Sequence, residues 1–229
     1  MMFRLNIPTG TKSRDGMDSL LLKTVAAAAL ILGAIAVFAA VKLSRDKREA
    51  RQLTLDAARL DQNDGSINLS DFLTKHKKFM HAISDCNEEQ CVYVADLRNG
   101  PLPFLHLAPH SEFNIYIIGK EGHVQEIYIS VKTAIAGAPF AATMRSASAT
   151  RCEGGCETFS SGAVVDTSGK IQFSTIELGP RATLADRRIA FQMNADCIFE
   201  MRGCSNPSRI TGGWPSLACE LRCPQTTVR

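Results

Sequence analysis

The sequence lacks the short motifs that mark the common classes of enzyme active site. It contains no G-x-S-x-G nucleophile turn, no Walker or dinucleotide-binding glycine loop and no H-E-x-x-H zinc motif. A C-x-x-C redox pair is absent as well, and the two C-x-x-x-C pairs lack the strand-to-helix setting that lowers a thiol pKa. The sequence therefore predicts a protein that is not an enzyme, with no catalytic residue, no cofactor and no metal site.

Charge is missing from residues 24–41, TVAAAALILGAIAVFAAV, which lie between Lys23 and Lys42. As a helix, these eighteen residues span about 27 Å, close to the ~30 Å hydrocarbon core of a bilayer. A soluble helix of this length keeps a polar face, and this stretch has none. We expect residues 19–43 to cross the bilayer as an uncleaved signal anchor.

A cleavable signal peptide is the alternative use of this stretch. Val37, Phe38 and Ala39, followed by Ala40, offer small residues near a cleavage point. Against this interpretation, more than twenty residues precede the apolar stretch. The stretch is also longer than the ~7–15 residues of an ordinary signal-peptide core.

Cysteine is missing from the head and from the apolar stretch, and all eight cysteines lie beyond them. They form four close couples, a pattern typical of disulfides in an oxidising compartment. The connectivity stays open, although pairing within each couple is favoured. A zinc site built from two couples, or reduced thiols in a cytosolic domain, are the alternatives. The disulfide candidates are Cys86, Cys91, Cys152, Cys156, Cys197, Cys204, Cys219 and Cys223.

The flanking charges alone do not fix the orientation. Basic residues are slightly more numerous after the apolar stretch than before it, which favours a cytosolic C-terminal side. The cysteines favour the opposite orientation, and we give them more weight. The expected location is the inner (plasma) membrane, single-pass, with the N-terminus cytoplasmic and the C-terminal domain periplasmic or extracellular.

The remaining sequence predicts an α+β fold: a single N-terminal transmembrane helix and a disulfide-stapled domain with a mostly antiparallel sheet and packing helices. The expected organisation is a flexible cytosolic head (1–18), a transmembrane signal anchor (19–43), a helical stalk (44–62) and an extracytoplasmic domain with a loop-rich tail (63–229). The alternating runs in EFNIYIIGKEGHVQEIYISVK predict a β-hairpin, and SGAVVDTSGKIQFSTIEL predicts a second one. We expect helices over 71–84, 133–150 (broken at Pro139) and 182–197, and strands over 91–97 and after 197.

Two groups of polar residues raise the question of metal binding. Residues 61–72, DQNDGSINLSDF, resemble a calcium loop, but with Gly65 at loop position 6 the ligands Asp61 and Asn63 fall out of register. A polar turn before a helix capped at Ser70 is the simpler interpretation. The histidine couples 76/81 and 106/110 lack a shared helical face, the second because of Pro109.

The predicted function is a membrane-anchored protein-interaction or assembly module, with the bilayer as partner of residues 19–43 and a protein partner of unknown identity. The region around Trp214 and Pro215 and the CEGGC loop (152–156) are the expected contact surfaces, because loops bounded by cysteines lose little entropy on binding. The alternatives are an envelope hydrolase or thiol–disulfide enzyme, and a calcium-dependent sensor. No basic, aromatic-rich patch follows the anchor, so no nucleic-acid partner is expected.

Overall fold

The computed structural model describes residues 14–62, 67–82, 90–100, 103, 109–147, 158–166, 169–179 and 182–214. The chain forms two compact units, residues 1–42 and residues 43–229. Its helices and strands give an α+β fold with one long N-terminal helix, as the sequence predicts. In chain order they are α1 (Arg14–Gln62), α2 (Leu69–Lys75), β1 (Met80–Ala82), β2 (Cys91–Arg98), β3 (Glu112–Lys120), β4 (His123–Ile135), β5 (Ala138–Ala147), β6 (Thr158–Asp166), β7 (Gly169–Leu178), α4 (Leu184–Ala190), η1 (Asp196–Phe199) and α5 (Ser208–Thr211).

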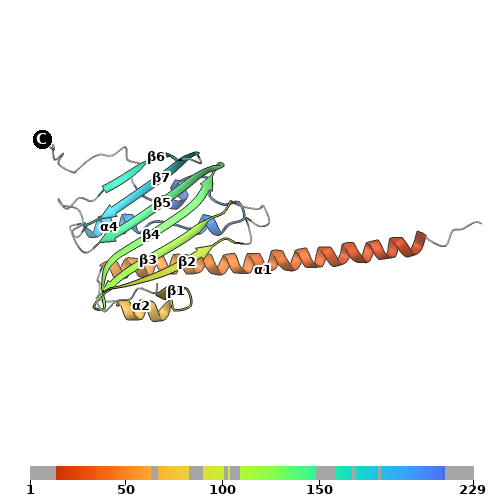
Figure 1. Ribbon diagram of the computed structural model, residues 1–229, viewed down its shortest axis with the longest axis horizontal. Coiled ribbons are helices and arrows are strands. Elements are labelled where there is room, and N and C mark those ends of the chain that lie inside the picture. The colour runs from red at the N-terminus through yellow and green to blue at the C-terminus, as the bar shows by residue number, and fades with distance from the viewer. Residues whose placement is uncertain are drawn as a thin grey trace, which may run out of the picture. The chain divides into compact units, whose positions relative to one another are not determined.

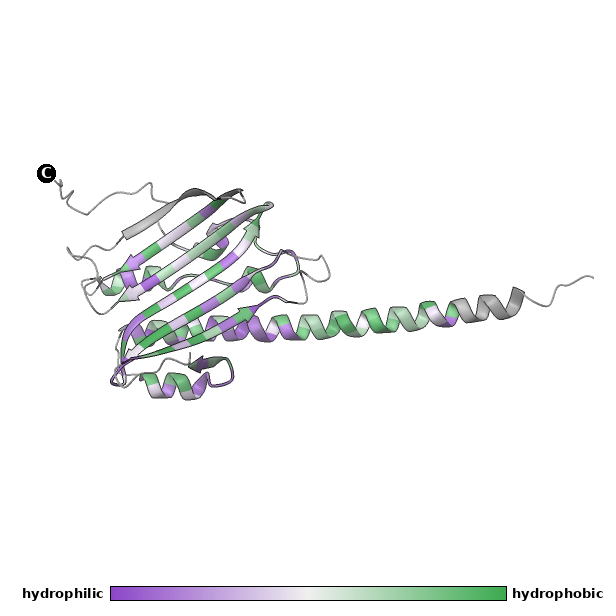
Figure 2. Ribbon diagram, in the orientation of Figure 1, coloured by the Kyte–Doolittle hydropathy of each residue, from purple (hydrophilic) through white to green (hydrophobic). Residues whose placement is uncertain are grey.

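The first half of α1 is a strongly apolar and exposed helix. Between Leu22 and Val41, nine large apolar side chains are 41–76% exposed. Figure 2 shows this stretch as an almost unbroken hydrophobic run along the helix. By length and composition the helix can cross a membrane, and a signal sequence has the same properties.

The second half of α1 is helical, as predicted for residues 44–62, but it lies in the core of the second unit and does not form a separate stalk. Leu53 and Ala57 are completely buried, and Leu43 and Leu60 are nearly so. They belong to the same core cluster as the isoleucines of the sheet. Their spacing places them on one helical face. That periodicity is visible in the sequence, but it does not reveal that a sheet covers the face.

Seven strands form one sheet in the order β1-β2-β3-β4-β5-β7-β6 (Figure 1). All neighbours are antiparallel except β5 and β7, which run parallel because the chain passes from β5 to β6 at the edge and returns through β7. In β3, β4 and β5 the buried face is built mainly from alternate residues. At its centre, Ile115 and Ile117 of β3 lie opposite Ile129 and Ile127 of β4, and all four are fully buried.

The first predicted hairpin is confirmed as β3 and β4. Its turn residues Glu121 and Gly122 both have positive φ, 51° and 79°. Such a pair forms the type I′ turn whose twist matches that of the strands it joins. The second predicted hairpin is confirmed as β6 and β7, which pair from Thr158 opposite Glu177 to Asp166 opposite Gly169.

The helix predicted over residues 133–150 is wrong, because β4 continues to Ile135 and β5 follows directly. Ala136 and Gly137 make a second turn with positive φ, 51° and 80°. Pro139 is tolerated because β5 pairs with β7 only from Phe140 onward, so the N–H that proline lacks is not required on that side.

The helix predicted over residues 71–84 ends early, at Lys75. Its N-cap is Asn68, whose Oδ1 accepts from the Asp71 N–H at 2.8 Å, and not Ser70 as the sequence predicts. Residues 76–79 turn, and β1 then pairs with β2 at the sheet edge. Pairing with the sheet therefore outweighs the helical periodicity beyond residue 75.

The C-terminal helices are also shorter than predicted. Helix α4 ends at Ala190, and the strand expected after residue 197 is instead the 3₁₀ helix η1. Thr183 caps α4 through a capping box with Asp186. In Figure 1 these C-terminal helices lie behind the sheet, and the face toward the viewer carries no helix.

Candidate functional site

The sheet face opposite the core carries no helix (Figure 1), and we call it the open face. Strand register defines it: Val94, Tyr116, Tyr128, Arg145 and Glu177 lie opposite one another in one row across five strands. A shallow hollow of about 330 Å³ occupies its centre. The hollow is lined by Val92, Asn114, Tyr116, Ile118, Glu126, Tyr128, Ser130 and Lys132.

Two tyrosines form the centre of the open face. The rings of Tyr116 and Tyr128 are tilted against each other with centroids 5.7 Å apart. Burial raises the pKa of Tyr128, which outweighs the lowering by a hydrogen bond with Ser130. Its hydroxyl therefore stays protonated at physiological pH. The pair offers apolar ring area together with hydrogen-bonding groups, the combination found at the energetic centre of protein interfaces.

Charged side chains around the tyrosines are held in fixed geometry. Arg145 donates from Nε and a terminal nitrogen to the two carboxylate oxygens of Glu126, at 2.7 and 2.9 Å. This bidentate arrangement orients the guanidinium beside Tyr128, which lies directly opposite Arg145 in the register. An apolar and aromatic centre with a charged rim is the usual anatomy of an interaction surface.

A buried ionic cluster lies on the other side of the domain, between α1 and the residues after α2. His76 is 2% exposed; its Nδ1 is 2.7 Å from Glu49 Oε1, and its Nε2 is 2.9 Å from Asp56 Oδ2. Each ring nitrogen therefore lies within hydrogen-bonding distance of a carboxylate. The sequence shows that His76 and His81 do not share a helical face, but it does not reveal the acidic partners of His76 on α1.

Asp56 is the centre of this cluster and is completely buried. Burial acts to raise its pKa, but hydrogen bonds from Lys75, Gln52 and His76, together with the Lys75 charge, lower the pKa overall. The Asp56 carboxylate is therefore ionised and paired. Its contacts join α1 to α2 and to the residue that follows α2, and we call this cluster the ionic clamp. The signal that could have found it is the 49/52/56 spacing of polar residues next to the apolar face of α1.

A second polar cluster occupies the end of α1. Arg187 donates to Asp61 Oδ2 at 2.6 Å and to Ser146 Oγ at 3.0 Å, and Ser146 also donates to Asp61. Asp61 is the first residue of the calcium-like stretch; residues 63–66 lie outside the described part of the chain. A cavity of about 310 Å³ lies beside this cluster. Arg187 of α4 and Ser146 of β5 both donate hydrogen bonds to the Asp61 carboxylate, so the cluster joins the end of α1 to α4 and β5.

Among the residues that the structure describes, no group of three or more His, Cys, Asp or Glu side chains is arranged to hold a metal ion. His81 is exposed. His110 lies 3.1 Å from Glu112, and His106 is outside the described residues.

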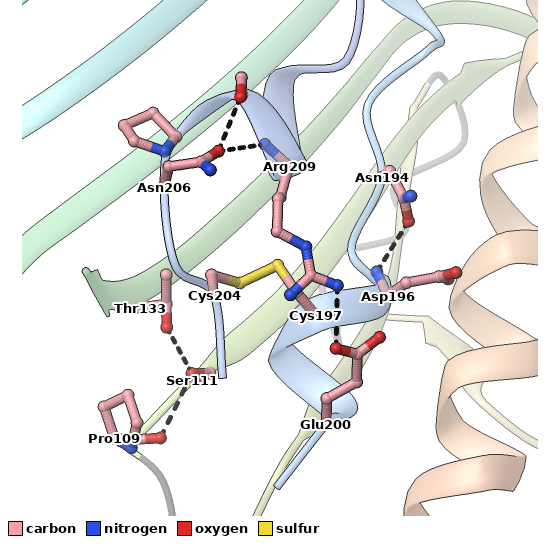
Figure 3. The surroundings of a disulfide bond; sticks show 12 residues. Pro109, Ser111, Thr133, Asn194, Asp196, Cys197, Glu200, Cys204, Asn206 and Arg209 are labelled. Carbon is pink, nitrogen blue, oxygen red and sulfur yellow. Dashed lines mark hydrogen bonds and ion pairs between the residues drawn. A yellow bond between two sulfur atoms is a disulfide. The ribbon is translucent and has the colours of Figure 1, made fainter. Parts of the chain in front are cut away.

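The disulfide between Cys197 and Cys204 closes a loop in the C-terminal region, as local pairing predicts for this couple (Figure 3). Cys91 is also disulfide-bonded. Within the closed loop, Glu200 accepts from Arg209 at 2.9 Å and from Lys47 of α1 at 3.0 Å. The remaining candidates, Cys86, Cys152, Cys156, Cys219 and Cys223, lie outside the described residues.

Trp214 is not part of an exposed contact surface, which corrects the prediction for this region. Its side chain is 9% exposed, and its indole N–H donates to the Ala190 carbonyl oxygen at 2.9 Å. Burial with a satisfied N–H indicates a core role. The CEGGC loop, the other predicted contact surface, is outside the described residues.

A scan against models of protein families, a search of curated proteins and a search of solved structures each find no match to this chain.

Proposed function

We propose that this protein is a single-pass membrane-anchored interaction or assembly module that presents the open face of its sheet to a protein partner. In this proposal residues 19–43 span the inner (plasma) membrane and the N-terminal head is cytoplasmic. The sheet domain then faces the periplasm or the extracellular space. No observation on the described residues favours the hydrolase, thiol–disulfide enzyme or calcium-sensor alternatives.

The single observation that carries the proposal is the exposed apolar half of α1. Nine large apolar side chains that are 41–76% exposed need a non-aqueous environment, and a bilayer supplies one over the right length. Burying each such side chain contributes about 1.5–3 kcal/mol, so the total far exceeds what tethering one chain requires. The disulfide in the second unit supports an oxidising compartment on the domain side.

The anchor is tested by extraction of native membranes with alkaline carbonate. The full chain is expected to stay in the membrane pellet. The variant Leu30→Lys/Ile35→Lys places two charges in the middle of the apolar run, at a cost of about 3 kcal/mol each, and a larger fraction of it is expected to be released than of the unchanged chain. Extraction of the unchanged chain by carbonate would contradict the anchor.

The open face is tested with a photo-crosslinking amino acid placed at Tyr128 in the membrane-bound chain. A discrete crosslinked product is expected there, and none from the same probe at Lys77, which is exposed on the turn after α2. Tyr116→Ser is expected to reduce the yield at position 128 without changing the melting temperature by more than about 2 °C. Equal products from both probe positions would argue against the open face as the contact surface.

A further inference from the structure

The helix α1 carries exposed arginines directly after its apolar run. Arg45 keeps 50% of its side chain exposed, and Arg48 is exposed as well. They are three residues apart and therefore share one side of the helix. Figure 2 shows the change from a hydrophobic to a hydrophilic stretch of α1 at this point.

The two arginines have few partners inside the domain. Arg45 lies 3.6 Å from Asp46 and 5.9 Å from the centre of the Phe79 ring. Among the described residues Arg48 forms no ion pair; its Nε donates to the Ser44 carbonyl oxygen at 3.3 Å. In these contacts, neither guanidinium group is joined to another element of the domain by an ion pair.

Two neighbouring basic residues of α1, Lys47 and Arg51, form ion pairs with another element of the domain. Lys47 pairs with Glu200 at 3.0 Å and with Asp196 at 3.6 Å, and Arg51 pairs with Asp196. Their charge is compensated by η1 and the residue after it. The two sets of cations therefore differ in their partners and not in exposure, because Arg51 keeps 61% of its side chain exposed and still pairs with η1.

Helix geometry places Arg45 and Arg48 at the depth of lipid headgroups. At about 1.5 Å per residue, Arg45 and Arg48 lie about 3 and 8 Å beyond residue 43 along the helix axis. The headgroup layer of one leaflet is about 5–8 Å thick. Arg51 and Arg59, about 12 and 24 Å beyond residue 43, lie outside that layer.

We propose that Arg45 and Arg48 bind the phosphate groups of anionic phospholipids, so that α1 selects acidic lipids around the end of its membrane span. The inference rests on the proposed membrane anchor. Two guanidinium groups on one helix side match the charge and hydrogen-bonding geometry of headgroup phosphates. Each basic side chain near an anionic surface strengthens lipid association about five-fold.

The test reconstitutes the full chain in phosphatidylcholine vesicles and first measures insertion by flotation and carbonate resistance. Spin-labelled phosphatidylglycerol and phosphatidylcholine then report which lipid associates with the protein. We expect wild type to favour phosphatidylglycerol about five-fold or more, and Arg45→Gln/Arg48→Gln to fall below about two-fold. Arg51→Gln/Arg59→Gln removes the same charge from the same helix and is expected to keep the wild-type preference.

The outcomes separate the two proposals. A chain that fails to insert into neutral vesicles overturns the membrane anchor, and the lipid site with it. A chain that inserts but shows no preference for phosphatidylglycerol overturns only the lipid site. Equal losses in the two double variants would also overturn it, because net charge and not position would then account for the preference.

Discussion

Removal of the His76 side chain tests the ionic clamp between α1 and the segment that follows α2. The ring contacts the carboxylates of Glu49 and Asp56 at 2.7 and 2.9 Å and packs against Phe72 with ring centroids 4.7 Å apart. His76→Ala leaves both carboxylates without this shared partner. The prediction is a large loss of stability of the second unit.

The size of that loss of stability depends on the partners that Glu49 and Asp56 keep when the ring is removed. Leaving a buried hydrogen-bonding group without its partner costs about 1–3 kcal/mol, and more for a charged group. Asp56 keeps Lys75, Gln52 and Arg59 as partners, and the Glu49 side chain is 21% exposed, so water replaces part of what it loses. Because two carboxylates lose a hydrogen-bonding partner, we expect His76→Ala to lower the free energy of unfolding by about 2–4 kcal/mol.

Urea unfolding in detergent micelles measures this change through the fluorescence of Trp214. It is the single tryptophan of the chain and is buried in the core of the second unit. His81→Ala is the matched control, because His81 is exposed on the edge strand β1, and it is expected to change stability by less than about 0.5 kcal/mol.

A double-mutant cycle with Glu49→Gln isolates the coupling between the ring and the Glu49 carboxylate, which is expected to exceed about 1 kcal/mol. A loss below about 1 kcal/mol for His76→Ala, or an equal loss for His81→Ala, would refute the clamp.

Three further predictions concern the same unit. The pKa of Asp56 is lowered from 3.8, so its ionised form stabilises the fold above that pH and this contribution is lost as pH falls through the lowered value; urea midpoints from pH 2 to 7 are expected to show the gap between Asp56→Asn and wild type closing toward acid. Replacing both Cys197 and Cys204 by serine opens a loop with a sequence separation of 7 and is expected to cost about 2–3 kcal/mol, measured by urea unfolding. Gly212→Ala, at φ 59° with the new Cβ 2.6 Å from a backbone oxygen, is expected to cost about 3 kcal/mol by thermal unfolding, against about 1 kcal/mol for Gly137→Ala, which meets no atom within 4 Å.

The parts of the fold that the sequence predicts correctly are those set by local chemistry. Alternation in β3 and β4, with the Glu121–Gly122 turn between them, identifies the first hairpin because both the period and the turn are local properties. The apolar half of α1 is also predicted correctly, because an uninterrupted stretch without charge is a local property of the sequence. The Ala136–Gly137 turn was not predicted, although it also depends on local residues. The small residues around it are typical of a helix, and Pro139 is typical of a break in a helix.

The parts that the sequence misses depend on tertiary partners. The helix expected over residues 71–84 ends at Lys75, where His76 contacts the carboxylates of Glu49 and Asp56 on α1 and β1 then pairs with β2. Trp214 beside a proline and two glycines suggests exposure, yet its indole N–H finds the Ala190 carbonyl. The open face was missed as a candidate site because register across five strands, and not sequence proximity, brings Tyr116, Tyr128 and Arg145 together.

The most direct test of the central claim locates the C-terminus relative to the membrane. Alkaline phosphatase, whose own disulfides form only in an oxidising compartment, is fused after Arg229 and compared with a fluorescent protein that matures in the cytoplasm. The account predicts a membrane-bound phosphatase fusion that is active and a fluorescent fusion that is dark. An inactive phosphatase with a bright fluorescent fusion would place the sheet domain in the cytoplasm and contradict the account.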